Sequence, residues 1–533
     1  MRPLLALLLL ALVPSAPDRT PPAVSGFQVR ADGRPFAGDR LLLATISPNG
    51  DGIRERATIA FRLAEPARVR VTVSKTLRRP EVVWRRTADL GKGRHRVHWA
   101  PQGIPARTYV VTLAAVDRAG NRTVLAAGSA RELRHGARRT PVVRVLGVEA
   151  GFERASYAPG QNAGLRIETD AGRLTLQLFR AGPERVPTTA RNVMNGEPVS
   201  EPRTLPWRRW RHGPRRVRLR IPDLPSGLYF ARLTADDGRV GYAPFVLRPA
   251  RLGTSRAAVV LPTNTWQAYN FRDEDGDGWG DTWYAGDASI PVRLGRAYLD
   301  RGVPPKYRAY DVGFLRWLHQ TGREVDYLAE DDLERARTGD TLAAAYDLIV
   351  FPGHTEYVTK KEFEVIERYR DLGGNLMFLS ANNFFWHVDR RGRILRKTRQ
   401  WRDLERPEAA LIGVQYLAND QGRRKGLYVV RSAARAPWLW EGTGLVEGAT
   451  FGHTHLGFGI EIDATTRRSP RGTIVLAEVP EIYGPGYTAQ MTYYETAAGA
   501  KVFAAGTLDF GGRARFKPVG RILSNLWTRL SQP

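Results

Sequence analysis

Three short apolar runs in the second half of the chain constrain its fold most strongly. They are Ala257–Leu261, Tyr346–Phe351 and Asn375–Leu379, and each is almost continuously hydrophobic. A strand that is buried on both faces has this character, whereas a strand with one solvated face alternates polar and apolar residues. Because helical patterns lie between the runs, the sequence predicts a doubly wound α/β domain with a parallel sheet over residues 252–533.

Two of the intervening segments have clear helical periodicity. The segment from Asp311 to Thr321 repeats apolar residues at helical spacing, and Asp311 and Gly322 are typical residues for its beginning and its end. The segment 360–372 has the same spacing and is followed by two glycines. We therefore expect a helix over each segment.

Residues 25–135 show a different pattern, in which short runs such as Ala57–Leu63 and Tyr109–Ala115 are separated by turn residues. This spacing predicts a β-sandwich. The segment Ile46–Gly52 and the turn Asp117–Asn121 resemble those of Ig-like domains of the FlgD type. The resemblance implies a spacer or adhesion domain rather than a catalytic one.

Residues 141–250 predict a second β-sandwich module, with strands at Leu174–Phe179 and Ser226–Leu233. The segment Trp207–His212 combines Trp with Arg, and further arginines follow it. Such a segment can stack on bases or bind anionic polymers. The alternative is a strand pair with inward Trp and a solvated Arg face, which the period-two pattern favours.

The beginning of the chain predicts export. Residues 1–20 have the pattern of a secretory signal peptide, with Arg2 before the apolar run Leu4–Val13. That run is about half of the ~20 residues that a membrane span needs, and no later stretch is long enough. We therefore expect a secreted or extracytoplasmic protein without a transmembrane span in the mature chain. The absence of cysteine excludes disulfides, thiol nucleophiles and thiolate metal sites.

The formal net charge of the chain is +27. Such a charge favours anionic partners, and cell-surface polymers are the expected class outside the cytoplasm. The arginines are spread along the whole chain rather than gathered in one stripe, which favours a compositional origin of the charge. We therefore predict no specific binding of nucleic acid.

The segment 273–281 is acidic at alternate positions, with Asp273, Asp275, Asp277 and Asp281 around glycines. Such a tight loop can wrap oxygen ligands around calcium. The twelfth position holds Tyr284 instead of the Glu of an EF-hand, so the pattern predicts a shortened calcium loop. The alternative is an acidic turn without a metal.

Polar residues follow two of the predicted parallel strands where each strand ends. His354, Glu356 and Tyr357 come after one strand, and Asn382 comes after the next. In a doubly wound sheet, the residues beyond the carboxyl ends of the strands face the ligand crevice. These four residues are the candidate catalytic group.

A second candidate group comprises His453 and His455, followed by Glu461 and Asp463. Two histidines at period two would share one face of a strand, which permits a metal site. The alternative is that they are structural, as isolated histidines more often are.

Seven segments occur in the order that is found in one known family. The segments are Leu261–Asn270, His354–Tyr357, Gly373–Leu376, Asn382–Trp386, Gly459–Asp463, Met491–Thr496 and Val502–Thr507. Together they resemble the C-terminal domain of the N,N-dimethylformamidase large (beta) subunit, over nearly all of residues 252–515. The resemblance implies a sheet similar to that of class I glutamine amidotransferases, without their cysteine.

The resemblance also implies amide hydrolysis by a single iron ion held by Tyr and Glu side chains. Tyr357 and Glu461 match positions in the family motifs, so they are the expected iron ligands. Hard oxygen ligands of this kind suit a ferric ion that acts as a Lewis acid. One position departs from the family pattern, because Phe385 stands where the motif usually has Tyr and carries no oxygen.

Two functions follow from these observations. The first is an extracytoplasmic hydrolase of C–N (amide) bonds in a small-molecule substrate, with metal assistance. The alternative is a non-catalytic cell-surface module that binds a glycan or an anionic wall polymer. Phe385 favours the alternative, whereas the polar residues at the strand ends favour the enzyme.

Overall fold

The computed structural model describes residues 18–77, 79–126, 140–186, 188, 190–284 and 290–532. The predicted signal peptide lies almost entirely outside these residues. The chain divides into two compact units. The first holds residues 1–35, 39–102 and 108–144, and the second holds 145–533 together with 36–38 and 103–107.

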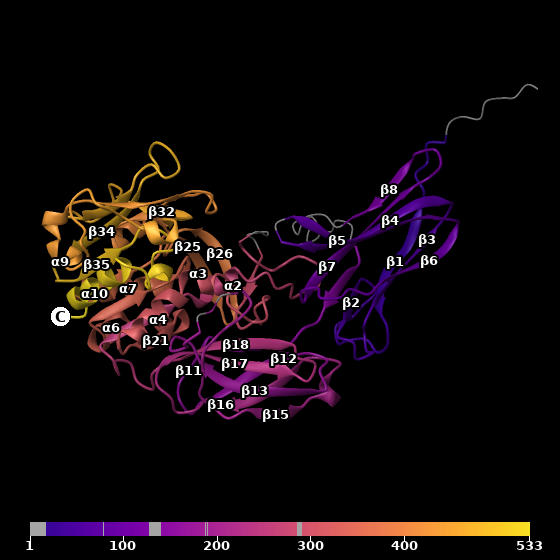
Figure 1. Cartoon of the computed structure of the whole chain (residues 1–533), viewed down its shortest axis with the longest axis horizontal. Helices are drawn as coiled ribbons and strands as arrows, with labels where there is room; N and C mark the ends of the chain where they lie inside the picture. The colour runs from indigo at the N-terminus through magenta and orange to yellow at the C-terminus, as the bar shows by residue number, and fades with distance from the viewer. Residues whose placement is uncertain are drawn as a thin grey trace, which may run out of the picture. The chain divides into compact units, whose positions relative to one another are not determined.

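The first unit consists of two sheets, drawn in indigo to purple in Figure 1. The predicted strand Ala57–Leu63 is confirmed as β3, where every second residue is buried. This alternation gives the sheet one apolar and one solvated face. The resemblance to the FlgD type stays a prediction. The strands are β1 (Val24–Ala31), β3 and β6 (Gly93–Trp99) in one sheet, and β2 (Leu43–Ile46), β9 (Val142–Val145), β7 (Arg107–Val116), β4 (Ala67–Thr76), β5 (Pro80–Leu90) and β8 (Arg122–Leu125) in the other.

The second unit begins with a further pair of sheets that share one apolar core. Tyr229 and Phe245 from neighbouring strands stack in this core, with ring centroids 5.9 Å apart. The predicted strand Leu174–Phe179 is confirmed within β13, and the predicted turn and strand over Ser226–Leu233 are confirmed by β17, which starts at Gly227. The strands are β10 (Glu149–Phe152), β12 (Asn162–Glu168) and β16 (Arg215–Arg220), and then β11 (Ser156–Tyr157), β18 (Val240–Leu247), β17 (Gly227–Ala235), β13 (Arg173–Arg180), β14 (Glu197–Pro198) and β15 (Arg203–Pro206).

The rest of the second unit is built on a nine-stranded sheet. Its first five strands run parallel, as predicted for the continuous apolar runs. The remaining strands are antiparallel. In order across the sheet, the strands are β21 (Asp326–Ala329), β19 (Ala257–Leu261), β22 (Leu348–Phe351), β24 (Asn375–Phe378), β35 (Lys501–Ala504), β34 (Ala489–Glu495), β33 (Ile474–Val479), β29 (Tyr428–Val430) and β30 (Thr450–Phe451).

Helices cover both faces of this sheet (Figure 1). Val350 and Met377 pack in one core with α4 and α10, whereas Ile349 and Leu376 pack in the other with α6, α7 and α8. Because successive strand residues point to opposite faces, the apolar runs supply both cores. The helices are α2 (Thr263–Ala268), α3 (Tyr307–Tyr310), α4 (Val312–Gln320), α5 (Glu330–Arg335), α6 (Gly339–Ala345), α7 (Lys360–Asp371), α8 (Glu408–Ile412), α9 (Pro437–Trp440) and α10 (Val519–Leu530).

Smaller sheets extend the edge of the domain. One of them is a four-stranded sheet, with the strand order β20 (Val292–Arg293), β26 (Ile394–Gln400), β25 (Trp386–Arg391) and β23 (Tyr357–Thr359). Two pairs are formed by β27 (Gln415–Asn419) with β32 (Glu461–Ala464) and by β28 (Lys425–Gly426) with β31 (Phe458–Gly459). The pairing of β27 with β32 matters most, because it brings a distant segment to the end of the parallel strands.

Three local predictions need correction. Asp311 precedes α4, but its side chain makes no capping hydrogen bond and accepts one from Trp266 Nε1 at 3.3 Å instead. The Arg-Trp segment forms a 3-10 turn over Arg208–Trp210 rather than a strand, since β16 starts only at Arg215. The segment His453–His455 is also a 3-10 turn, between residues with positive φ, so it presents no strand face.

None of the helices in the described part of the chain combines the length and the hydrophobicity that a membrane crossing needs.

Candidate functional site

The candidate catalytic residues lie beyond the carboxyl ends of β22 and β24, which are neighbouring parallel strands. The chain leaves β22 through Gly353, where a Cβ atom would come within 2.0 Å of Asp311 Oδ1. Only glycine permits this close approach. The turn at Gly353 directs the segment that carries His354 and Glu356 across the end of the sheet.

His354 lies between two carboxylates. Its Nε2 atom is 3.3 Å from Glu461 Oε2 and 3.7 Å from Glu356 Oε2. All three side chains are buried, with 3–6% of their surface exposed. A carboxylate buried so deeply is costly unless it is paired, so the imidazole is positioned to balance their charge.

Glu461 is held by residues from two further segments. Asn382 Nδ2 donates to its Oε2 at 2.8 Å, and Asn419 Nδ2 donates to its Oε1 at 2.7 Å. The backbone around it is strained, because Ile460 has φ 77° and Asn382 has φ 55°. A β-branched residue in the left-handed region is rare, and strain of this kind gathers at functional sites.

Two tyrosines close the group from the side of α2. Tyr269 donates its hydroxyl proton to Glu356 Oε2 at 2.5 Å. The ring of Tyr357 packs 4.8 Å from that of Trp283, and its hydroxyl is directed to Glu356. Tyr357 therefore packs among aromatic rings while its polar end reaches the carboxylates.

The surroundings shift the pKa values of Glu356 and Glu461 in opposite directions. Burial raises the pKa of Glu356 above its usual range, against the opposing effect of His354. Burial acts in the same direction on Glu461, but His354, Asn382 and Asn419 outweigh it and lower the pKa of Glu461. Burial disfavours the charged imidazole, yet Glu461 and Glu356 prevail and raise the pKa of His354. One carboxyl group is thus disposed to hold a proton and the other to remain ionised.

Three buried polar atoms of the group have no hydrogen-bond partner within the described residues. They are His354 Nδ1, Asn382 Oδ1 and His354 Nε2, although Nε2 lies near the two glutamates. Buried polar atoms are nearly always paired, so an unpaired one in a native protein calls for an explanation, and a ligand supplies one.

Phe385 lies beside this group. It is buried, its ring is 4.9 Å from that of Tyr416, and the guanidinium of Arg402 lies 5.0 Å from its centroid. If the family Tyr at this position is an iron ligand, that ligand is missing here. Tyr357 and Glu461 provide oxygen atoms, but the residues present do not fit the full set.

The acidic segment 273–281, called the acidic loop below, lies between α2 and β20 in the chain. Asp273 accepts hydrogen bonds from the N–H groups of Gly276 and Gly278, both at 2.7 Å. Carboxylate oxygens of Asp273, Asp275 and Asp281 come within 4.8 Å of one another. Asp277 is not in this group of three, and it accepts a hydrogen bond from the N–H of Trp279 at 2.8 Å. Burial, together with the neighbouring aspartates, raises the pKa of Asp273 well above its usual range.

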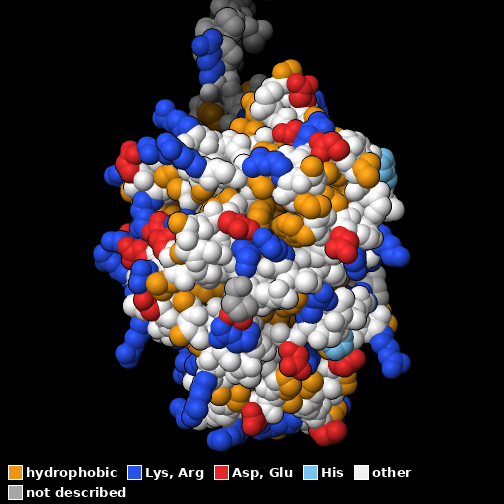
Figure 2. Space-filling model, turned by 90° about the vertical axis from the view of Figure 1, so that its left-hand side faces the viewer, with side chains coloured by type: hydrophobic (Ala, Val, Ile, Leu, Met, Phe, Trp, Pro, Cys, Tyr) orange, Lys and Arg blue, Asp and Glu red, His pale blue; other side chains and the backbone are white. Residues whose placement is uncertain are grey.

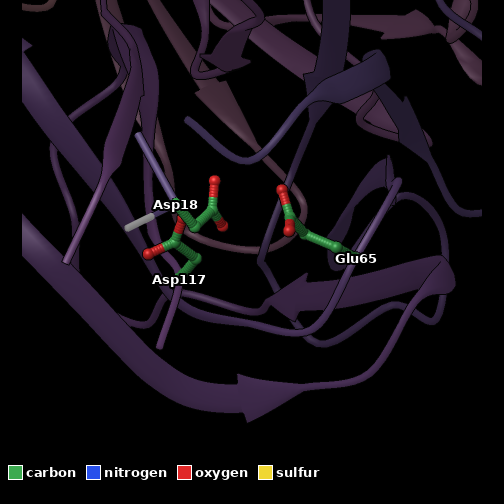
Figure 3. Close-up of side chains that lie close together, drawn as sticks. All are labelled: Asp18, Glu65 and Asp117. Carbon is green, nitrogen blue, oxygen red and sulfur yellow. The ribbon is translucent and has the colours of Figure 1, made fainter. Parts of the chain in front are cut away.

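The first unit contains another group of carboxylates, formed by Asp18, Glu65 and Asp117 (Figure 3). Asn121 links two of them, since its Nδ2 donates to Asp117 Oδ2 and to the backbone oxygen of Asp18, both at 2.9 Å. Asp18 is exposed, and the other two are half-buried. Exposed acidic groups are common without an ion, so this proximity alone does not define a metal site.

The basic charge has no single focus on the face drawn in Figure 2. Figure 2 shows blue Lys and Arg side chains spread over the viewed face, with red carboxylates among them. In the Arg-Trp segment, Trp207 is buried, whereas Trp210 is half-buried between Arg209 and Arg215, whose Cζ atoms lie 4.7 and 3.9 Å from its ring centroid. The arginines of β16 are exposed, as the alternative of a solvated face predicts.

Five residues that the sequence predicted lie together in the structure, and other members of the group were not predicted. The structure brings together His354, Glu356, Asn382 and Glu461, with Tyr357 next to Glu356. His453 is exposed and is not part of the group. Tyr269 and Asn419 were missed. Tyr269 lies in a segment of the family resemblance, which is a usable signal, whereas nothing local marks Asn419.

Comparison with known proteins agrees with the resemblance. A family model described as N,N-dimethylformamidase beta subunit-like, C-terminal, matches residues 184–518. The N,N-dimethylformamidase beta subunit of Alcaligenes sp. is 29% identical over 157 residues, which cover 28% of this chain and 19% of the relative. That of Paracoccus aminophilus is 28% identical over 165 residues, which cover 30% of this chain and 20% of the relative.

The matched region thus spans about a fifth of the length of each relative. A solved structure of Escherichia coli alpha-2-macroglobulin aligns with 43% of this chain and 16% of its own, at 11% identity and a TM-score of 0.23, which is too low to bear on the fold. The family model, in contrast, covers more than half of the chain. It also covers the buried group of His354, Glu356, Tyr357, Asn382 and Glu461, which is called the His354 group below. The chain therefore belongs to the N,N-dimethylformamidase beta subunit-like, C-terminal family.

Proposed function

We propose that this protein hydrolyses C–N bonds of amides. The observation that carries the proposal is the buried group in which His354 lies between Glu356 and Glu461, at the carboxyl ends of parallel strands. Family membership supports it, because the two relatives are named N,N-dimethylformamidase subunits. In α/β folds, small ligands bind in the crevice at this edge of the sheet. We include in the proposal that the domain is arranged like an amidotransferase, with its site at this edge.

The two carboxyl groups divide the proton transfers. Glu461, which is held ionised, accepts a proton from the water molecule that adds to the amide carbon. Glu356, whose pKa is raised, donates a proton to the leaving nitrogen as the C–N bond breaks. His354 stabilises the ionised carboxylate throughout, and Asn382 fixes its orientation. The products are a carboxylic acid and an amine.

Iron held by Tyr357 and Glu461 stays a prediction. Since Phe385 contributes no oxygen, no step of the proposed reaction is assigned to a metal. Metal analysis of the purified protein checks this, and one iron per chain would restore metal assistance to the proposal.

Export and a binding role form the second part of the proposal. The pattern of residues 1–20 supports a secreted or extracytoplasmic protein, and the net charge of +27 supports contact with anionic wall polymers there. If Phe385 has removed catalysis, a non-catalytic module that binds a glycan or wall polymer is the function that remains. Wall-polymer binding that is unchanged in a Glu461→Gln variant, in a protein without amidase activity, would favour it.

The test of catalysis is amine release from a panel of formamides, acetamides and primary amides. We expect Glu461→Gln to lower kcat by at least about 100-fold, which is typical for loss of an acid–base group. Glu405→Gln is the matched control, because the Glu405 side chain is 88% exposed. Unchanged thermal unfolding of both variants would separate loss of chemistry from loss of fold. Equal rates for wild type and Glu461→Gln would refute the mechanism.

A further inference from the structure

A cavity of about 450 Å³ opens next to the His354 group. Tyr310 and Ile460 form part of its wall. The ring of Tyr310 lies 6.4 Å from that of His354, and Ile460 directly precedes Glu461. One wall of the cavity is therefore also the wall of the proposed catalytic group.

Four arginines line this cavity, namely Arg308, Arg316, Arg513 and Arg515. Arg316 and Arg513 are half-buried, whereas Arg308 and Arg515 are exposed at its rim. They come from distant parts of the sequence, since α3 and α4 carry two of them and the segment before α10 carries the others. The cavity is thus basic both inside and at its entrance.

Among the described residues, fewer acidic groups than arginines line the cavity. Asp509 is the one carboxylate of this described lining, and it is shared between Lys425 Nζ at 2.6 Å and Arg513 at 3.1 Å. Glu184 lies near Arg316, and burial raises the pKa of Glu184 against the opposing effect of Arg316. Even with Glu184 included, basic groups outnumber acidic ones. A low-dielectric hollow with excess charge of one sign concentrates ligands of the opposite sign.

We propose that this cavity binds a small anionic group, a carboxylate or a phosphate, of the amide that the His354 group cleaves. The guanidinium fork binds either group through paired hydrogen bonds, which gives orientation as well as affinity. With the anion held by Arg316 and Arg513, the amide part of the substrate would have to extend past the wall formed by Tyr310 and Ile460 to reach Glu461. The substrate class would then be an acylated amine with a negatively charged substituent. This inference rests on the proposed amidase function.

Binding is tested first, without reference to activity. Inorganic phosphate and N-formylglycine are titrated into the full chain by calorimetry, with N-formylglycinamide as the uncharged analogue. We expect saturable binding of both anions, weakened about 10- to 100-fold by Arg316→Gln or Arg513→Gln, and weaker binding of the uncharged analogue that neither substitution changes. Arg471→Gln is the control, because Arg471 is exposed and does not line the cavity. Arg515→Gln removes a rim charge without disturbing buried side chains and should weaken binding by a smaller factor.

Kinetics then distinguish this inference from the proposed function. On a cleaved anionic amide, Arg316→Gln should raise KM with little change in kcat, and its rate on the uncharged analogue should match wild type. Anion affinities that are the same in wild type, Arg316→Gln, Arg513→Gln and Arg515→Gln overturn the cavity assignment, even if the protein is an amidase. Arginine-dependent anion binding in a protein that cleaves no amide upholds the anion site and overturns only its link to catalysis.

Discussion

Two carboxylate-rich regions of the second unit differ in what balances their charge. In the His354 group, the imidazole lies between Glu356 and Glu461, and side-chain amides donate to Glu461. In the acidic loop, Asp273 and Asp277 accept hydrogen bonds from backbone N–H groups, and three aspartates face one another within 4.8 Å.

The difference indicates which groups balance the carboxylate charge of each region. A protonated imidazole carries a full charge, so the His354 group can balance one carboxylate with residues of the fold itself. Backbone N–H groups provide only partial charges, and like charges this close repel one another. The acidic loop is therefore the region where an added cation should matter, whereas the His354 group should depend on its histidine.

The largest effect is expected from His354→Gln. Removal of one partner from a buried ion pair leaves an uncompensated charge, which typically costs about 3–5 kcal/mol of unfolding free energy. Denaturant unfolding near neutral pH measures it, with His319→Gln as the control because His319 is exposed. An equal and small loss in both variants would mean that the histidine does not balance the carboxylates.

Calcium should stabilise the protein through the acidic loop. At a free concentration of about 100 times Kd, binding to the native state adds about 2.7 kcal/mol to the unfolding free energy. We expect Tm to rise with calcium and to fall with a chelator, and both responses to be lost in Asp273→Asn but kept in Asp389→Asn, which alters an exposed aspartate. A Tm that changes with neither calcium nor the chelator would show that the loop is an acidic turn without a metal.

A pH dependence of intermediate size should come from Asp311, which adjoins the His354 group. Burial raises its pKa to about 8, although Trp266 and His354 favour the ionised form. Between pH 4 and 8 the native state therefore holds a proton that the unfolded state releases, so stability falls as pH rises. Asp311→Asn should remove on the order of 2 kcal/mol of this loss between pH 6 and 7.5. Parallel stability curves for both proteins would contradict the assignment.

The smallest effect on stability, below about 1 kcal/mol, is expected for Phe385→Tyr, because the two side chains have similar shape. Its value lies in metal content, since the added hydroxyl would complete an oxygen set with Tyr357 and Glu461. Iron per chain, measured after purification with ferrous or ferric salts, should rise above that of wild type. No gain in iron would indicate that Phe385 is not the position that matters.

Part of the architecture was predictable from local patterns. The continuous apolar runs of β19, β22 and β24 indicate strands buried on both faces, and parallel strands linked by helices end at one edge. His354, Glu356 and Asn382 could therefore be assigned to a common edge before any contact was known. Side-chain period and chain direction suffice for that inference.

Other features depend on contacts between distant segments. Glu461 reaches His354 because β32 pairs with β27, and Asn419 arrives through the same pairing. The basic cavity arises where α4 and the segment before α10 come together. The turn His453–His455, expected as a strand, shows the limit of local reading. Sequence by itself determined which segments form buried strands and that the polar residues after two of them share one edge. Only the tertiary structure decided which charges meet, because long-range packing places segments that no local period relates.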